Sequence, residues 1–130
     1  MDTSIAVSFG ELVDKLTILE IKKSKIKNQD KLKKIETELI LLKEKASLLE
    51  SENKKNYTKL FNELTEVNTK LWDIEDNIRK FESKKEFNDE FIELARSVYF
   101  LNDERFRIKS EINKLFKSKI QEVKEYIKYS

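Results

Sequence analysis

The property of this sequence that most constrains its fold is the near-absence of residues that break helices. The chain contains no proline and one glycine, Gly10. A β protein needs many such residues in the turns between its strands, so the composition argues against a sheet. Charged residues make up 40% of the chain and hydrophobic residues 38%. Together these properties predict long, exposed helices that pack through narrow apolar stripes.

Apolar residues recur at helical spacing in four segments of the chain. The first follows Ser8, and the second follows a polar turn at residues 27–30. The third begins at Tyr57, after a polar stretch at residues 51–56. We expect that stretch to be a loop. The alternative is one continuous helix with a break in its heptad register. The fourth segment runs from about residue 88 to 116.

Two helical hairpins are the natural assembly of these segments, because short connections make neighbouring helices antiparallel. We therefore expect a single all-α domain over residues 1–130, built as an antiparallel four-helix arrangement. After Lys117 and Ser118 we expect a short amphipathic tail that packs back on the bundle. The apolar face of this tail consists of Ile120, Val123, Tyr126 and Ile127.

Two places in the sequence have the spacing of a capping box, in which a side chain at each end of the first helical turn binds the other's backbone amide. Ser8 and Glu11 form the first pair, and Ser83 and Glu86 form the second. One of residues 88–89 is the alternative cap for the last helix. Both boxes predict where a helix begins.

Gly10 falls in the first turn of the first predicted helix. A glycine there costs about 1 kcal/mol relative to alanine. The pattern favours simple tolerance of glycine at a fraying helix end. The alternative is that another backbone approaches this position closely.

The composition excludes several classes of function. The chain has no cysteine and no histidine, which rules out disulfides, thiolate metal sites and catalysis by histidine. A net charge of +2 gives no overall field for nucleic acid. Seven lysines against one acid lie between Lys22 and Lys34, which we interpret as a solvated turn and not a phosphate site.

No apolar run approaches the length of about 18 residues that a membrane crossing requires. The N-terminal stretch, residues 1–15, is acidic where a signal peptide is basic. We therefore expect a cytoplasmic protein with no membrane contact.

A row of polar and aromatic side chains lies beside the apolar stripe of the third segment. Folding the third and fourth segments back about residue 84 brings this row level with a similar row on the fourth. The combined row is either a polar latch between helices, which the pattern favours, or the wall of a ligand groove. Its candidate residues are Asn68, Trp72, Glu75, Arg79, Glu93, Arg96, Tyr99, Asn102 and Arg105.

The four arginines of the chain lie within 29 residues, in a sequence that otherwise uses lysine. Arginine binds carboxylates in a fixed two-bond geometry that lysine lacks. The clustering therefore predicts defined ion pairs in this half of the molecule, and Arg105 even interrupts an apolar stripe. The candidate partners are Glu75, Asp76, Glu93 and Asp103.

Three blocks of the sequence, SFGELVDKLTILEIK at residues 8–22, VNTKLWDIEDNIR at 67–79 and FIELARSVYFLNDERFRIKSEIN at 91–113, resemble the hallmark blocks of an uncharacterised bacterial family. Its members are small helical domains of unknown function, and the likeness extends over essentially the whole chain, including IQEVKEY at 120–126. One departure is Lys117, where the family resemblance leads us to expect a glycine. The resemblance carries no established activity over to this chain.

Long apolar stripes, abundant charge and the lack of a catalytic set favour a non-catalytic interaction module without a cofactor. Narrow stripes of this kind often need a second chain to complete their burial. We therefore expect a protein partner or self-association. Binding of an anion or small ligand between the third and fourth segments is one alternative.

Two enzyme classes stay open as further alternatives. One is an all-α, Mg²⁺-dependent nucleotide hydrolase, because the acid pairs resemble the helical motifs of MazG-like pyrophosphohydrolases. Its metal ligands are Asp73, Asp76, Glu90 and Glu93. The other is a bundle similar to chorismate mutase, in which Arg79, Arg96 and Lys109 supply the cations.

Overall fold

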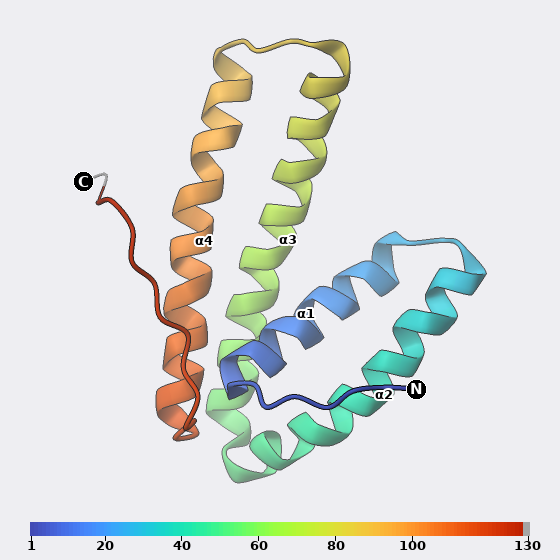
Figure 1. Cartoon of the computed structure of the whole chain (residues 1–130), viewed down its shortest axis with the longest axis vertical. Coiled ribbons are helices and arrows are strands. Elements are labelled where there is room, and N and C mark those ends of the chain that lie inside the picture. Colours follow the sequence, from blue (N-terminus) through green and yellow to red (C-terminus); the bar gives the residue numbers. More distant parts are fainter. Residues whose placement is uncertain (129–130) are drawn as a thin grey trace.

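The computed structural model describes residues 1–128, and four helices make up most of this part of the chain (Figure 1). They are α1 (Phe9–Lys25), α2 (Gln29–Glu52), α3 (Lys54–Lys84) and α4 (Asp89–Leu115). No strand occurs within residues 1–128. The predicted all-α, four-helix arrangement is therefore confirmed. None of the helices in the described part combines the length and hydrophobicity needed to cross a membrane.

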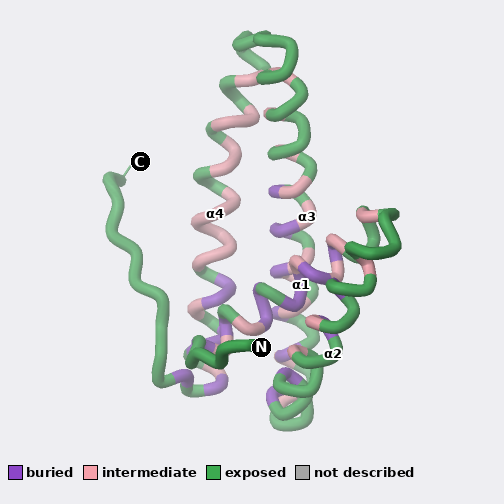
Figure 2. Tube along the Cα trace, turned by 45° about the vertical axis from the view of Figure 1, so that its right-hand side comes forward, coloured by how far each residue is buried: buried purple, intermediate pink, exposed green. Residues whose placement is uncertain are grey.

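The two hairpins pack at one end of the molecule only. α1 lies against the lower halves of both α3 and α4, while α2 packs mainly on α1 at the edge (Figure 1). Buried residues gather where α1 meets α3 and α4 (Figure 2). This core contains Val13, Leu16, Leu64, Ile108 and Ile112, among others.

The upper part of the α3/α4 hairpin projects beyond the other two helices (Figures 1 and 2). We call this part, residues 72–100, the distal hairpin. No residue in it is buried. The apolar side chains between its two helices are only half-buried, because no third helix covers them: Ile74, Ile78, Phe81, Phe91, Leu94 and Val98.

The expected loop at residues 51–56 is wrong, because α2 and α3 meet at a single residue, Asn53. Its backbone N–H donates to the carbonyl of Leu49, ending α2. Its side-chain oxygen accepts from the amide of Asn56 at 3.3 Å, starting α3. One asparagine thus ends one helix and caps the next, so this sharp turn needs neither glycine nor proline.

The second predicted capping box, Ser83 with Glu86, is also wrong. Ser83 lies inside α3, where its hydroxyl donates to the carbonyl of Lys80 at 2.7 Å. The cap of α4 is Asn88, one of the alternatives considered, which accepts from the amide of Phe91 at 3.0 Å. The α3 helix therefore continues to Lys84 before the chain turns.

The C-terminal segment, residues 117–128, begins with a turn and then runs back along α4 without forming a helix (Figure 1). The expected packing of an apolar face on the bundle is wrong for the described part of the tail. All four of its apolar residues are exposed: Ile120, Val123, Tyr126 and Ile127. Polar contacts hold the segment instead, and they belong to the site described next. Residues 129–130 lie outside the described part of the chain.

Candidate functional site

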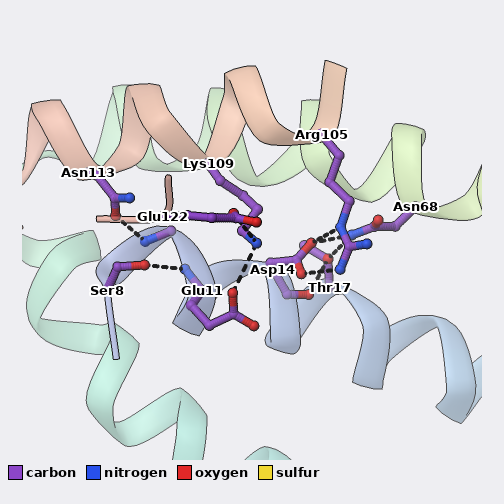
Figure 3. Close-up of polar contacts among 10 residues, drawn as sticks. Ser8, Glu11, Asp14, Thr17, Asn68, Arg105, Lys109, Asn113 and Glu122 are labelled. Carbon is purple, nitrogen blue, oxygen red and sulfur yellow. Dashed lines mark hydrogen bonds and ion pairs between the residues drawn. The ribbon is translucent and has the colours of Figure 1, made fainter. Parts of the chain in front are cut away.

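A buried ion pair joins α1 to α4. The side chain of Asp14 on α1 is 1% exposed and faces Arg105 on α4 (Figure 3). The Arg105 Nε donates to one carboxylate oxygen at 2.9 Å, and a terminal guanidinium nitrogen donates to the other. Such two-bond pairing is about twice as strong as a neutral hydrogen bond and has a fixed geometry.

Asn68 and Thr17 complete this cluster from α3 and α1. The Asn68 amide donates to the Asp14 carboxylate at 2.9 Å and to the Thr17 hydroxyl at 2.8 Å. The Thr17 hydroxyl in turn donates to the backbone carbonyl of Asp14 at 2.7 Å. We call these four residues the polar lock, because they connect α1, α3 and α4 in one network (Figure 3).

The polar lock satisfies the groups that it buries. Within the described residues, no buried side-chain nitrogen or oxygen lacks a hydrogen-bond partner. The hydrogen bonds that Arg105 donates to Asp14 raise the pKa of Arg105, although burial opposes this shift. A carboxylate that is enclosed and accepts three hydrogen bonds is poorly placed to act as a base on a substrate. The lock therefore fixes the positions of three helices.

A second charged cluster lies one turn of α4 further along. The Lys109 side chain is 8% exposed, and its ammonium group lies 2.9 Å from Glu11 on α1 and 2.9 Å from Glu122 in the C-terminal segment. Burial lowers the pKa of Lys109, but the hydrogen bonds that its ammonium donates to Glu122 and Glu11 outweigh burial and raise the pKa. Lys109 thus ties the C-terminal segment to the core.

This pairing also changes the first predicted capping box. Ser8 does accept from the amide of Glu11 at 3.1 Å, as expected. The Glu11 carboxylate, however, binds Lys109 on α4. Glu11, the third residue of α1, therefore joins α1 to α4 and does not close the capping box.

Gly10 lies directly against the backbone of α4. Its N–H donates to the side-chain oxygen of Asn113 at 2.7 Å. A Cβ atom built on Gly10 would lie 2.5 Å from the carbonyl oxygen of Lys109, closer than real Cβ contacts. The interpretation of Gly10 as a tolerated residue at a fraying end is wrong. Only glycine lets α1 approach α4 this closely.

Three cavities surround this region, and Asn102 lines all of them. One, of about 240 Å³, includes Trp72, Glu75 and Arg105. The largest of the three, about 620 Å³, lies between α4 and the C-terminal segment. The third, about 270 Å³, lies over the Lys109 cluster. The residues that line the 620 Å³ cavity include Arg96, Tyr99, Phe100, Lys124 and Tyr126.

The structure divides the predicted polar row into separate groups. Asn68 and Arg105 are closed into the polar lock. Trp72, Glu75 and Asn102 line the 240 Å³ cavity with Arg105, while Arg96, Tyr99 and Asn102 line the 620 Å³ cavity. Arg79 and Glu93 lie outside both cavities; Arg79 is exposed on the distal hairpin, and Glu93 pairs with Arg96 at 3.1 Å. The row therefore contains parts of a latch and parts of two cavity walls.

The predicted partners of the arginines were mostly different from those in the structure. Glu93 binds Arg96, as expected. Arg107 binds Glu104 and Glu111 on its own helix. Asp14, the partner of Arg105, was not among the candidate carboxylates. The sequence position of Asp14 could have indicated a buried ion pair. Asp14 falls on the same helical face as Ile18 and Ile21, and a charge that is buried on an apolar face needs a partner.

The alternative magnesium site is not assembled in this structure. Asp73 lies 3.6 Å from Lys25 and forms an ion pair with it. Within residues 1–128, no three acidic side chains come together in a way that could hold a metal ion. The proposed ligands Asp73, Asp76, Glu90 and Glu93 therefore do not form one group.

These features define an all-α domain whose helices are held by a buried polar lock and whose α3/α4 hairpin projects freely. The chain belongs to the family of unknown function DUF6165, which it matches over residues 3–129. This finding fits the expected membership of an uncharacterised family. No curated protein and no solved structure matches the chain.

Proposed function

We propose that this protein is a non-catalytic interaction module that associates with a second copy of itself through the distal hairpin. One observation carries the proposal: none of residues 72–100 is buried, although the hairpin has a continuous apolar stripe on each helix. The same two helices are well covered lower down, where α1 packs against both of them. The distal hairpin thus offers a helix-sized position that nothing in its own chain fills.

Exposed side chains on the distal hairpin support this proposal. Phe87, Ile92 and Phe100 are 55%, 49% and 51% exposed. Each square ångström of apolar surface removed from water contributes roughly 25 cal/mol. Covering the half-buried stripe and these side chains with a partner helix therefore stabilises a complex. Exposed apolar surface of this kind is typical of protein-interaction sites.

The polar lock supports the same proposal from the other end of the helices. Asp14, Asn68 and Arg105 fix where α3 and α4 leave the core. Ordering a mobile surface on binding costs free energy, and a surface that is already fixed avoids much of that cost. The lock is therefore proposed to present the distal hairpin in one orientation.

Light scattering coupled to size-exclusion chromatography tests the proposal over a range of protein concentrations. We expect a dimer mass for the wild-type chain and a monomer mass for the double variant Ile92→Ser/Phe100→Ser. Leu41→Ser/Leu48→Ser is the matched control, because both leucines are exposed on α2. A wild-type chain that stays monomeric at the highest attainable concentration would exclude this function.

A second candidate function is binding of a small ligand in the 620 Å³ cavity between α4 and the C-terminal segment. Its volume is in the range of about 300–1,000 Å³ that is common for ligand sites. Tyr99, Phe100 and Tyr126 offer ring surfaces there, and the charges of the lining are two cations, Arg96 and Lys124, against one acid, Asp103. This lining suits a planar ring that carries a negative group. NMR titration with an aromatic sulfonate, comparing wild type with Tyr99→Ala, tests this candidate.

A further inference from the structure

The Lys109 ammonium group on α4 binds a carboxylate that comes from the C-terminal segment (Figure 3). Only 8% of the Lys109 side chain is exposed, and its Nζ lies 2.9 Å from the Glu122 carboxylate and 2.9 Å from the Glu11 carboxylate. An ammonium group has three N–H donors, so these two bonds leave one donor for a further acceptor. The structure thus shows a carboxylate held on a buried lysine by a segment that lies outside the helices.

A cavity of about 270 Å³ lies beside this pair and contains further hydrogen-bond donors. Asn102 and Arg105 line it together with Lys109. Within residues 1–128 the side-chain amide of Asn102 makes no hydrogen bond. Arg105 binds Asp14 through Nε and one terminal nitrogen, which leaves its other terminal nitrogen for a ligand. The cavity therefore suits a molecule that brings hydrogen-bond acceptors.

The charges around the cavity decide which kind of anion can replace the Glu122 carboxylate. Three cations and two acids line the cavity: Arg105, Lys109, Lys124, Glu11 and Glu122. Asp14, which is bound to Arg105, adds a third acid, so the whole group is neutral. Exchanging the Glu122 carboxylate for one external carboxylate keeps this balance. A divalent anion would leave an uncompensated negative charge in a partly buried place, which is costly.

The segment that supplies Glu122 buries little apolar surface of its own. Four of its apolar residues are exposed: Ile120, Val123, Tyr126 and Ile127. Besides the pair of Glu122 with Lys109, the segment contacts α4 through the Lys124 ammonium, which lies 5.4 Å from the centre of the Phe106 ring. Contacts of this kind near the surface are individually weak. Glu122 can therefore leave Lys109 without exposing an apolar core.

We infer that Lys109 and its cavity form a binding site for a small monocarboxylate, and that Glu122 is an internal ligand which such a molecule displaces. The external carboxylate takes the position of the Glu122 carboxylate, and the rest of the ligand lies in the cavity beside Asn102 and Arg105. The volume is just below the range of about 300–1,000 Å³ for drug-sized ligands, so it suits a molecule of a few heavy atoms. This site is far from the distal hairpin, so the inference does not depend on self-association.

Chemical rescue by acetate tests the site in the full-length chain. Glu122→Ala removes the internal carboxylate, and Glu125→Ala is the matched control, because Glu125 is exposed on the same segment. Melting temperatures are measured in acetate and in chloride at equal ionic strength. Because a bound ligand stabilises the folded state, acetate should raise the melting temperature of Glu122→Ala by roughly 4 °C at about ten times its Kd. Glu125→Ala should respond to acetate as the wild type does.

The double variant Glu122→Ala/Lys109→Met separates binding at this site from the general effect of acetate on protein stability. It should show no rise specific to acetate, because the cation that binds the carboxylate is absent. Methionine keeps the apolar stem of the buried side chain, and circular dichroism checks that each variant is folded. Relative to this double variant, sulfate should stabilise Glu122→Ala less than acetate does, since sulfate carries two charges.

In the wild-type chain acetate must compete with Glu122, so its apparent affinity should be roughly tenfold lower than in Glu122→Ala. Two-dimensional NMR measures both affinities, and the amide signals of residues 119–124 should shift as Glu122 leaves Lys109. A folded Glu122→Ala protein without an acetate-specific rise in melting temperature would overturn the inference. Equal affinities in wild type and Glu122→Ala would also overturn it, as would wild-type signals that do not move at any acetate concentration. None of these results bears on self-association.

Discussion

Asp14 and Arg105, which are far apart in the sequence, form a two-bond ion pair in the interior where α1 crosses α4. Asn68 adds a third donor to the same carboxylate from α3. Removing one member of a buried pair leaves an uncompensated charge, which costs far more than the pair itself contributes. The structural effect of this pair can therefore be measured by changing its two members separately and together.

Arg105→Met should lower the free energy of unfolding by about 3 kcal/mol, because it leaves the Asp14 carboxylate without its cation. The double variant Asp14→Leu/Arg105→Met should be less destabilised than Arg105→Met alone, since it buries no unpaired charge. Urea denaturation measures all three proteins. Arg107→Met is the control and should cost less than about 1 kcal/mol, because its ion pairs are on the surface. Equal losses for the single and double variants would contradict the role of the lock.

Gly10→Ala should destabilise the protein by about 1–3 kcal/mol, because the added methyl group meets the Lys109 backbone. The usual effect has the opposite sign, since alanine favours a helix over glycine by about 1 kcal/mol. Thermal unfolding followed by circular dichroism gives the sign directly. The same substitution in an Asn113→Ala background should still destabilise, because that change removes a side-chain contact and leaves the backbone contact. A Gly10→Ala protein as stable as wild type would refute the close approach of α1 and α4.

Local pattern was enough to predict the helices and their pairing. The repeat of apolar residues at three- and four-residue spacing placed Leu60, Leu64 and Val67 on one face of α3, and all three are buried. The turn predicted at residues 27–30 was nearly right, because α1 ends at Lys25 and α2 begins at Gln29, which leaves residues 26–28 as the turn. Such patterns report on one helix at a time, so they carry little information about which helices cross.

The polar lock was harder to predict, because its members come from three helices. Asn68 stood out on its helix as a polar residue beside an apolar stripe, and Arg105 stood out as a charge within one. Their partner Asp14 belongs to the other hairpin, and no sequence pattern indicated that this hairpin packs against α4. The contact of Gly10 with α4 was hard to predict for the same reason, because it also joins α1 to the other hairpin. Only the crossing of α1 over α3 and α4 brings these residues together.

The C-terminal segment shows that helical spacing over a few residues does not by itself predict a helix. Residues 120–127 have the spacing of an amphipathic helix, yet they are extended in the structure. A helix of so few residues is marginal in water, since its first turn is costly to form. The contacts of Ser118 with Phe9 on α1 and of Glu122 with Lys109 on α4 hold the segment in place without helical structure.

Lys117→Gly should stabilise the protein by about 0.5–1 kcal/mol. Lys117 adopts a φ angle of 53°, in the left-handed region that favours glycine. Its side chain costs about 1–2 kcal/mol in that region, and the greater freedom of glycine in the unfolded chain offsets part of the gain. Lys114→Gly in the last turn of α4 is the matched control and should cost about 1 kcal/mol. A loss of stability in Lys117→Gly, measured by urea denaturation, would contradict the strained turn.

The stability of the protein should fall at alkaline pH, and Tyr57 should account for part of the fall. Burial, with a smaller effect from Glu50, raises the pKa of Tyr57 to about 12. The folded state therefore holds this proton more tightly than the unfolded state, whose tyrosines ionise near pH 10. The resulting stabilisation is complete below about pH 10 and is lost as the pH rises toward about 12. Lys109, whose pKa is also raised, acts in the same direction.

Tyr57→Phe separates the contribution of Tyr57 to the alkaline loss of stability from that of Lys109. Phenylalanine keeps the ring that stacks on Phe61 and removes the ionisable hydroxyl group. The melting temperature of this variant should fall less steeply than that of wild type as the pH rises above about 10. At neutral pH the two proteins should differ little, which provides the internal control. Lys109→Met should in contrast be less stable already at neutral pH, since it leaves Glu11 and Glu122 without their shared cation. Parallel pH profiles for wild type and Tyr57→Phe would show that the hydroxyl of Tyr57 does not contribute to the alkaline loss.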